Sequence, residues 1–508
     1  MELELNRTEL SGFETAVDTT LFSEETLECI VPDACPDVLR ILDTHGLVCV
    51  KSKEAGEGRA ELRGVILVSV LYLPDGAEGV RKVEVSIPFT CGTDVAGATP
   101  GCPVMALPRL LSADARMLNP RKLYLRAELA IGLQVFVPSP LVYSAGGEQP
   151  EDLGIQQRRE SCQACIVTDV QEKPFTFSDD LSLPGSKPDI EELLRQRVEL
   201  FCTESKVIGN KLIFKGQAAL TLLYRGTDQT LSTVLFELPF SQIMEVSGGG
   251  EDANCAMELF LSDLTCYADG EDPRRVSVSM GIIAQAALRE ERKVELVTDL
   301  YSTIYEVECD EQEDVFCRLS ESGSRRQSVR EPLETPVGVK SVVDCRLALG
   351  VVTQSWNGAN LVLSADVRAE VLYIGEDDAL CFVARPVSTE CQLEPEPDCQ
   401  CTCHCVCVGE LYATPSSSGL EVRFPLDFVY RIEKRRMVRE IAAARLDRET
   451  PLDMTKRPSI VLRRLEAGEE LWNVAKAYFT TVTDIIWANE LADENVPAGK
   501  LLLIPKRR

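Results

Sequence analysis

The sequence has little of what enzymes and nucleic-acid-binding proteins require. It contains only two histidines, His45 and His404, and no nucleophile elbow, phosphate-binding loop or HExxH zinc motif is present. Acidic residues outnumber basic ones and give a net charge of -28, which argues against nucleic acid and anionic membranes as partners. These absences favour a protein that is not an enzyme, has no catalytic residues and uses no cofactor.

Long hydrophobic runs are also missing. The longest, GVILVSVLYLP at 64–74, is too short to span a bilayer, so no membrane insertion is expected. The first residues, MELELNRTELSGFE, lack the basic and apolar regions of a signal peptide. We therefore expect a cytoplasmic location, where the 20 cysteines would be thiols rather than disulfides.

Cysteines are concentrated in one segment, which includes Cys391 and five alternating residues from Cys399 to Cys407. Clustered thiolates are zinc ligands, so a metal site is one interpretation. Strict alternation, however, would place all five on one face of a strand, where reduced cysteine behaves as a small apolar side chain. We favour the buried strand face and expect no metal. The pair Cys162 and Cys165 has metal-type spacing, but no second pair lies nearby.

The rest of the chain repeats itself three times. Tyr72, Tyr224 and Tyr373 each end an apolar, strand-like run, at spacings of 152 and 149 residues. Other landmarks keep the same order: the proline pairs are Pro32 and Pro36, Pro184 and Pro188, and Pro332 and Pro336. A period near 150 residues is the size of a domain. It predicts three units, residues 1–160, 161–310 and 311–446, with polar linkers at 144–161, 309–331 and 446–458.

Inside each unit the apolar residues mostly alternate, as in ANLVLSADVRAEVLY, which is typical of strands that follow hairpin turns. The fold class is therefore expected to be mainly β, with three tandem antiparallel β-sandwich-like repeats. A short helix is expected where Pro36-Asp37 and Pro188-Asp189 begin a run, because proline suits the first helical turn. His45 would then lie at the end of such a helix.

The last segment, 459–507, has a different pattern: strand, helix, helix, strand. Apolar residues recur at helical spacing in GEELWNVAKAYF and again in TTVTDIIWANEL, and GKLLLIP closes with a strand. Thr481 and Asp484 have the spacing of a capping box at the second helix. The pattern predicts a small β-α-α-β domain, and its basic and acidic residues balance, so the acidic excess belongs to the repeats.

This segment closely resembles the LysM domain. The family pattern is met at Gly468, Leu471, Trp472, Ala475, Tyr478, Thr480, Thr481, Val482, Ile485, Asn489, Leu491, Gly499, Leu501, Leu503, Ile504 and Pro505. The resemblance implies binding of N-acetylglucosamine polymers in a groove between two loops. The site residues expected, for a glycan or a protein, are Gly468, Glu469, Glu470, Leu471, Trp472, Asn489, Glu490, Leu491 and Asn495.

Three features of the segment leave alternatives open. Glu469-Glu470 stands where the family has Asp followed by Ser or Thr, and glutamate is a poor helix cap. Asn489 is expected either to contact ligand or to satisfy backbone groups after the second helix. Trp472 and Trp487 lie at the edges of the apolar helix faces, as interface aromatics and ordinary packing residues both do.

The whole layout resembles SPOCS-domain proteins of spore-forming bacteria, of the SipL-like kind. The resemblance rests on three β-rich copies, the opening Pro36, Asp37, Ile41 and Leu42, and the terminal LysM pattern. The third copy departs, with Val337 in place of Asp. The resemblance implies a scaffold in spore coat or cortex assembly. It implies docking of a coat morphogenetic ATPase or another coat protein through LysM, in the mother cell at the forespore surface. The alternative is a peptidoglycan-binding protein.

Overall fold

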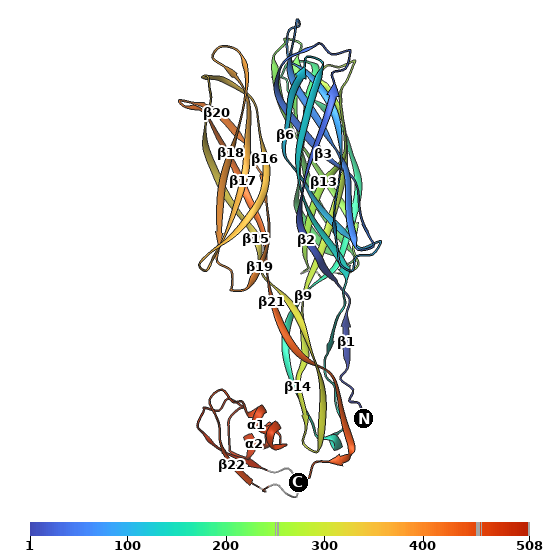
Figure 1. The fold of residues 1–508 in the computed structure, drawn as a ribbon, viewed down its shortest axis with the longest axis vertical. Helices are drawn as coiled ribbons and strands as arrows, with labels where there is room; N and C mark the ends of the chain where they lie inside the picture. Colours follow the sequence, from blue (N-terminus) through green and yellow to red (C-terminus); the bar gives the residue numbers. More distant parts are fainter. Residues whose placement is uncertain (249, 251–252, 454–457, 459, 506–508) are drawn as a thin grey trace.

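The computed structural model describes residues 1–248, 250, 253–453, 458 and 460–505. These residues form three long β bodies, here called the head, above a narrow stalk, with a small domain beside the tip of the stalk (Figure 1). The chain is mainly β, as the alternating sequence patterns predicted.

One six-strand order occurs three times along the head. The first unit contains β2 (Phe13–Ile30), β3 (Val38–Gly56), β4 (Arg59–Pro74), β5 (Arg81–Asp94), β6 (Val104–Asn119) and β7 (Lys122–Pro138). The second contains β9 (Ile155–Ser182), β10 (Ile190–Ile208), β11 (Lys211–Gly226), β12 (Leu231–Glu245), β13 (Asn254–Ala268) and β14 (Arg275–Ser302). The third contains β15 (Tyr305–Glu334), β16 (Val339–Asn357), β17 (Asn360–Gly375), β18 (Leu380–Leu393), β19 (Cys399–Val406) and β21 (Gly419–Pro451), with β20 (Tyr412–Ser416) added.

The strand pairing is the same in the three units. The second, third and fourth strands of each form an antiparallel sheet, in the orders β3-β4-β5, β10-β11-β12 and β16-β17-β18. The remaining strands pair as β6-β7-β2, β13-β14-β9 and β19-β21-β15. The limits 1–160, 161–310 and 311–446 stay a prediction; β9 and β15 begin before residues 161 and 311. The linker predicted at 309–331 is wrong, since this segment lies within β15.

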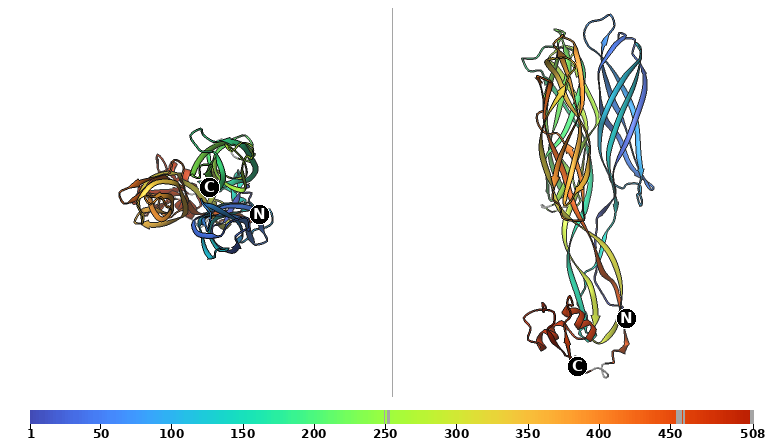
Figure 2. Two further views of the ribbon diagram at one scale, coloured as in Figure 1. Left: turned by 90° about the horizontal axis from the view of Figure 1, so that it is seen from above. Right: turned by 60° about the vertical axis from the view of Figure 1, so that its left-hand side comes forward.

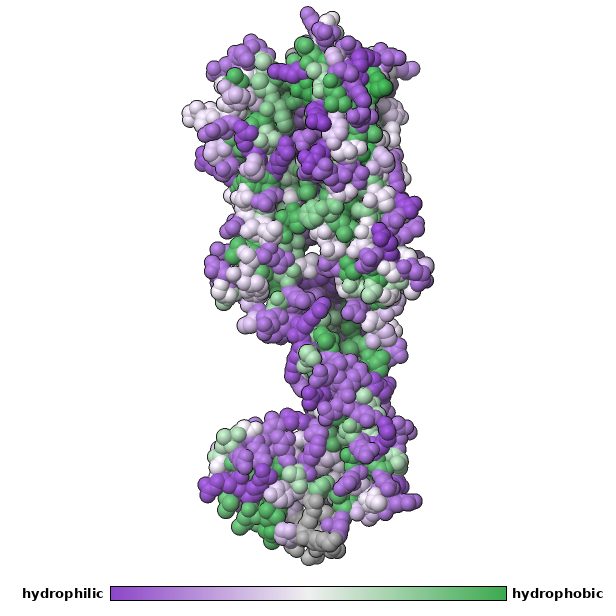
Figure 3. Space-filling model, in the orientation of Figure 1, coloured by the Kyte–Doolittle hydropathy of each residue, from purple (hydrophilic) through white to green (hydrophobic). Residues whose placement is uncertain are grey.

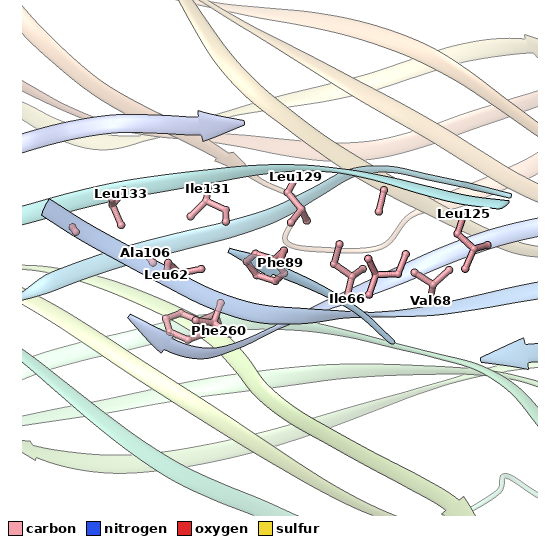
Figure 4. Close-up of a cluster of buried hydrophobic side chains, with 14 of the residues drawn as sticks. Leu62, Ile66, Val68, Phe89, Ala106, Leu125, Leu129, Ile131, Leu133 and Phe260 are labelled. Carbon is pink, nitrogen blue, oxygen red and sulfur yellow. The ribbon is translucent and has the colours of Figure 1, made fainter. Parts of the chain in front are cut away.

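Each unit has its own apolar core between its sheets. Figure 4 shows part of the first core, where Leu62, Ile66 and Val68 of β4 face side chains of β7 such as Leu125 and Leu129. Full burial of such a side chain contributes roughly 1.5–3 kcal/mol. Phe260 of β13 also belongs to this cluster, so the second unit packs directly onto the first.

The repeated tyrosines and prolines contact each other in the first two units. The Tyr72 hydroxyl donates to the carbonyl of Pro36 at 3.1 Å, and Tyr224 donates to Pro188 at 3.0 Å. The helices predicted at these prolines are wrong, because a turn leads directly into β3 and β10. His45 therefore lies partly buried within β3, paired with Ser69, and not at a helix end. Strand pairing and burial of alternate residues override the local preference of proline for a first helical turn.

The three units surround a common axis (Figure 2, left). Asp43, Arg195 and Asp344 occupy the same position in β3, β10 and β16, at the spacings of 152 and 149 residues that separate the tyrosines. Each lies directly after a register shift in its strand, and such bulges re-aim side chains. The equivalent positions two residues later hold His45, Arg197 and Arg346.

These residues form a buried ion network on the axis. Arg346 binds Asp43 through two nitrogens at 2.6 and 2.7 Å, and Arg195 binds both Asp43 and Asp344. The four side chains are at most 4% exposed. Burial alone would raise the pKa of Asp43, but the charges and hydrogen bonds of Arg346 and Arg195 outweigh burial and hold that pKa far below its usual range. All three units are thereby joined through charges removed from water.

Because the two histidines have lowered pKa values, we expect the folded chain to lose stability at mildly acidic pH. Burial lowers the pKa of His45 well below its usual range, and the nearby arginines lower it further; burial also lowers the pKa of His404. The unfolded chain then binds protons below about pH 6.5 that the folded chain does not. We expect the free energy of unfolding to fall by up to about 1.4 kcal/mol per pH unit for His45 between pH 6.5 and 5, and by less for His404.

Urea unfolding at pH 7.5, 6.5 and 5.5 measures this slope. The variant His45→Gln should unfold with a shallower pH dependence, and His404→Gln serves as its comparison because that side chain is 27% exposed. If the stability of His45→Gln and of the parent depends equally on pH, the lowered pKa of His45 does not cause the loss of stability.

The stalk is formed by the far ends of four head strands. The lower parts of β9, β14, β15 and β21 run together below the head, alongside the short pair β1 (Arg7–Leu10) and β8 (Leu141–Ser144), and a 3-10 turn lies at Glu151–Leu153 (Figures 1 and 2). Its apolar contacts include Leu300 of β14, Ala444 of β21 and Leu3 from the N-terminal segment. The β14 and β21 strands therefore each belong to the head and to the stalk.

The cysteine run forms a strand that contacts the core of the third unit. Cys399, Cys401 and Cys403 are partly buried against this core, and Cys405 and Cys407 are buried in it. The predicted strand face toward the core is confirmed in part: four of the five cysteines lie in β19 and contact the core, but only Cys405 of these is fully buried, and Cys407 follows the end of the strand. Among the described residues, no group of three or more His, Cys, Asp or Glu is arranged to hold a metal ion.

The C-terminal domain has the predicted β-α-α-β order. Its elements are β22 (Ile460–Arg464), α1 (Leu471–Tyr478), α2 (Val482–Ala488) and β23 (Leu501–Pro505). Thr481 caps α2 by accepting a hydrogen bond from the Asp484 amide at 3.0 Å, as its spacing predicted. Leu471, Val474 and Ile485 lie in one small core. The predicted limits at 459 and 507 lie outside the described residues. No helix in the described part of the chain is long and apolar enough to cross a membrane.

Candidate binding site on the C-terminal domain

The first predicted wall of the site is the turn into α1. Gly468 has a φ of +81°, which favours glycine, and no atom lies near the place of a Cβ. Glu469 is held inside the domain: it accepts from Arg463 at 2.7 Å and from the Glu466 amide at 3.2 Å. Leu471 belongs to the core and is 1% exposed. Glu469 and Leu471 therefore shape this wall rather than project from it.

Glu470 occupies the helix-cap position of α1 but makes no side-chain cap. Its carboxylate instead pairs with Arg158 of β9 at 2.6 Å, and both side chains are partly exposed. The poor capping expected of glutamate is confirmed. The sequence pattern gave no sign of the pairing with Arg158, which joins the predicted site to the stalk.

The second predicted wall follows α2. The Asn489 amide nitrogen donates to the carbonyls of Ile485 at 2.8 Å and Leu503 at 2.7 Å, and its oxygen accepts from the Leu503 amide at 2.7 Å. Asn489 therefore ties α2 to β23, as the backbone-satisfying interpretation expected. Glu490 has a φ of +49° and is exposed, and the Leu491 side chain packs against the domain core.

The remaining predicted site residue, Asn495, is exposed, and its backbone N–H donates to the Asp493 carboxylate at 2.8 Å. Gly468, Glu490 and Asn495 therefore offer exposed surface, whereas Glu469, Leu471 and Asn489 serve the domain itself. Whether these residues contact a ligand stays a prediction.

Trp472 points toward the stalk rather than into solvent. Its indole nitrogen donates to the Asp299 carboxylate of β14 at 2.7 Å, and its ring meets Tyr301 edge-on at 5.0 Å between centroids. Lys476, one turn further along α1, binds the other oxygen of Asp299 at 2.5 Å. Tyr301 is buried in the domain core and donates to the carbonyl of Thr480 at 2.7 Å.

Trp487 differs from Trp472 because it is 84% exposed on α2. The outer face of the small sheet is also apolar: Ile460, Leu462 and Leu501 are each more than half exposed. Leu462 lies directly opposite Leu503 in the antiparallel pair. Large exposed apolar side chains gathered on so small a domain are typical of interaction surfaces.

Comparisons with known proteins agree with this architecture. A family model described as SipL, SPOCS domain matches residues 37–118 and 189–269, and the LysM domain model matches residues 465–505. The chain carries SPOCS domains and a C-terminal LysM domain. Neither the curated proteins nor the solved structures yielded a significant match.

SPOCS and LysM are binding-type domains without catalysis, and no enzyme family is indicated. Together they mark a sporulation-related protein with a LysM domain of the peptidoglycan-binding class. The two SPOCS matches fall in the first and second units. The third unit has the same strand order, but Val337 follows its Pro336 where Asp37 and Asp189 follow the equivalent prolines.

Arg158, Asp299 and Tyr301 are the contact residues that sequence reasoning missed. They lie more than 170 residues from their LysM partners, so no local pattern connects them. The buried ion network could have been found from the sequence, because its charged residues Asp43, Arg195 and Asp344 have the same spacings as the three tyrosines.

Proposed function

We propose that this chain is a non-enzymatic scaffold of spore coat and cortex assembly whose LysM domain docks another coat protein. The partner implied by the SipL-like layout is the coat morphogenetic ATPase. The assembly would form in the mother-cell cytoplasm at the forespore surface. The observation that carries the proposal is Trp487, which offers 84% of its surface on the LysM domain. Exposed tryptophans are enriched among the residues that dominate protein interfaces.

Two further observations support protein docking over sugar binding. The groove wall before α1 carries Glu469 and Glu470, whose carboxylates are already paired with Arg463 and Arg158. The Asn489 side chain is fully engaged with backbone groups. The groove therefore keeps few free polar groups with which to orient a sugar.

Peptidoglycan binding is the second candidate function. The LysM match over residues 465–505 favours it, because LysM domains as a class bind N-acetylglucosamine polymers. Gly468, Glu490 and Asn495 would supply the exposed part of the groove.

A binding experiment with the full chain separates the two functions. The immobilised protein is titrated with the purified coat ATPase, and separately with N-acetylglucosamine oligomers and insoluble peptidoglycan. We expect saturable ATPase binding that Trp487→Ala weakens at least tenfold, equivalent to about 1.4 kcal/mol. Trp356→Ala is the matched control, since Trp356 is 50% exposed but lies on the head.

Saturable sugar binding without ATPase binding would replace the scaffold proposal by the peptidoglycan alternative. ATPase binding that Trp356→Ala and Trp487→Ala leave equally strong would remove Trp487 from the interface.

A further inference from the structure

The contacts between the LysM domain and the stalk converge on a few side chains. Asp299 on β14 accepts from both Trp472 and Lys476 of α1, one on each carboxylate oxygen. A carboxylate that accepts from an ammonium group makes a strong, charge-assisted hydrogen bond. Asp299 thus binds the helix at two points one turn apart and fixes its orientation on the stalk.

Tyr301 adds an apolar contact next to these polar ones. Its ring is 4% exposed and packs with Leu465, Leu471 and Val474, so a stalk residue completes the core of the LysM domain. Its hydroxyl donates to Thr480 between the two helices. Because a domain this small has little core of its own, a borrowed aromatic ring contributes substantially to its position.

The same surface includes part of the predicted ligand groove. Glu470, Leu471 and Trp472 are expected groove residues, and of these Glu470 pairs with Arg158 while Trp472 binds Asp299. The indole nitrogen of Trp472 has one hydrogen to donate, and Asp299 takes it. By contrast Trp487 has no such cover and is 84% exposed.

We propose that the tip of the stalk is an internal docking partner of the LysM domain and keeps the Trp472 edge of its groove masked. Asp299, Tyr301 and Arg158 form the stalk side of this latch, and Glu470, Trp472 and Lys476 form the LysM side. An external ligand reaches Trp472 only after the latch opens, whereas the Trp487 surface is available in both states. The latch deepens the proposed function by assigning the two tryptophans to different partners, but it does not depend on the identity of the external partner.

Fluorescence of Trp472 tests the latch in the full chain. The chain has three tryptophans, so Trp356→Phe with Trp487→Phe leaves Trp472 as the sole reporter. In this background Asp299→Ala should shift the emission to the red and raise quenching by acrylamide several-fold. Asp310→Ala is the matched control, because Asp310 is a stalk carboxylate that pairs with Arg445 and not with LysM.

Asp299 also accepts a hydrogen bond from the Leu300 backbone N–H, so Asp299→Ala could change the stalk itself. A second variant on the LysM side separates this effect from opening of the latch. Lys476→Glu places a negative charge against Asp299 from the LysM side and should produce the same red shift and quenching. Unchanged emission and quenching in both variants would overturn the latch. This result is separate from the proposed function, which fails when the parent chain binds sugar and does not bind the ATPase.

Discussion

Replacing Asp43 by Ala is expected to destabilise the head by about 3–5 kcal/mol, the usual cost of breaking one side of a buried ion pair. The loss of one carboxylate leaves Arg346 with only Glu370 and Arg195 with only Asp344 as acidic partners within the network. These guanidinium groups are 2% exposed, so water cannot replace the missing charge. Asp43→Asn keeps the shape of the side chain and removes its charge. It should therefore also destabilise the head, but by less than Asp43→Ala.

The matched control is Asp94→Ala. Asp94 also pairs with an arginine, Arg59 at 3.4 Å, but the two side chains are 91% and 57% exposed. An exposed pair contributes about 0–1 kcal/mol, so the control should be close to the parent. Urea unfolding, combined with hydrogen exchange of head amides because three units need not unfold in one step, measures both variants. Equal midpoints for Asp43→Ala and Asp94→Ala would show that the axial network contributes no more than a surface pair.

The network acts on specificity as well as on stability. At two equivalent positions the first unit carries Asp43 and His45, the second Arg195 and Arg197, and the third Asp344 and Arg346, so no two units present the same pair of side chains. An arrangement with two carboxylates in contact would bury like charges, which costs several kcal/mol. The sequence differences among the units therefore favour one order of the three units around the axis.

Local patterns predicted the β strands and the LysM helices because those elements bury one face. Alternation at ANLVLSADVRAEVLY gave β17, and the spacing of Leu471, Val474 and Ala475 gave α1, since each pattern reports a buried face within a few residues. The repeat period was equally visible because Tyr72 and Tyr224 are fully buried and hydrogen-bonded to prolines of the same unit.

The stalk could not be predicted from such patterns. Residues 309–331 were interpreted as a linker because they are polar and contain Gly and Ser, yet they form part of β15. Most of this strand is exposed on both faces and pairs with β21, so its residues are polar and show no clean alternation. The contacts of Arg158 and Asp299 depend on where those long strands end, which the local sequence does not encode.

Asn489→Ala is expected to unfold the LysM domain in most molecules at room temperature. The substitution removes three side-chain hydrogen bonds, two to Leu503 of β23 and one to the Ile485 carbonyl of α2, each with a net contribution of about 0.5–1.5 kcal/mol. A core of this size rarely supplies more than about 3–5 kcal/mol. The loss is therefore comparable to the whole stability of the domain.

Asn495→Ala is the control that separates a structural asparagine from a ligand-binding one. Both residues belong to the predicted groove, but Asn495 is exposed and its side chain bridges no elements. Thermal unfolding followed by Trp472 and Trp487 emission, in the Trp356→Phe chain, should show a lost transition for Asn489→Ala and a parental one for Asn495→Ala. A folded Asn489→Ala domain that has lost only sugar binding would make Asn489 a ligand residue after all. Failure of an unfolded Asn489→Ala domain to bind sugar would therefore say nothing about the groove, whereas Asn495→Ala and Glu490→Ala probe its exposed wall without removing its support.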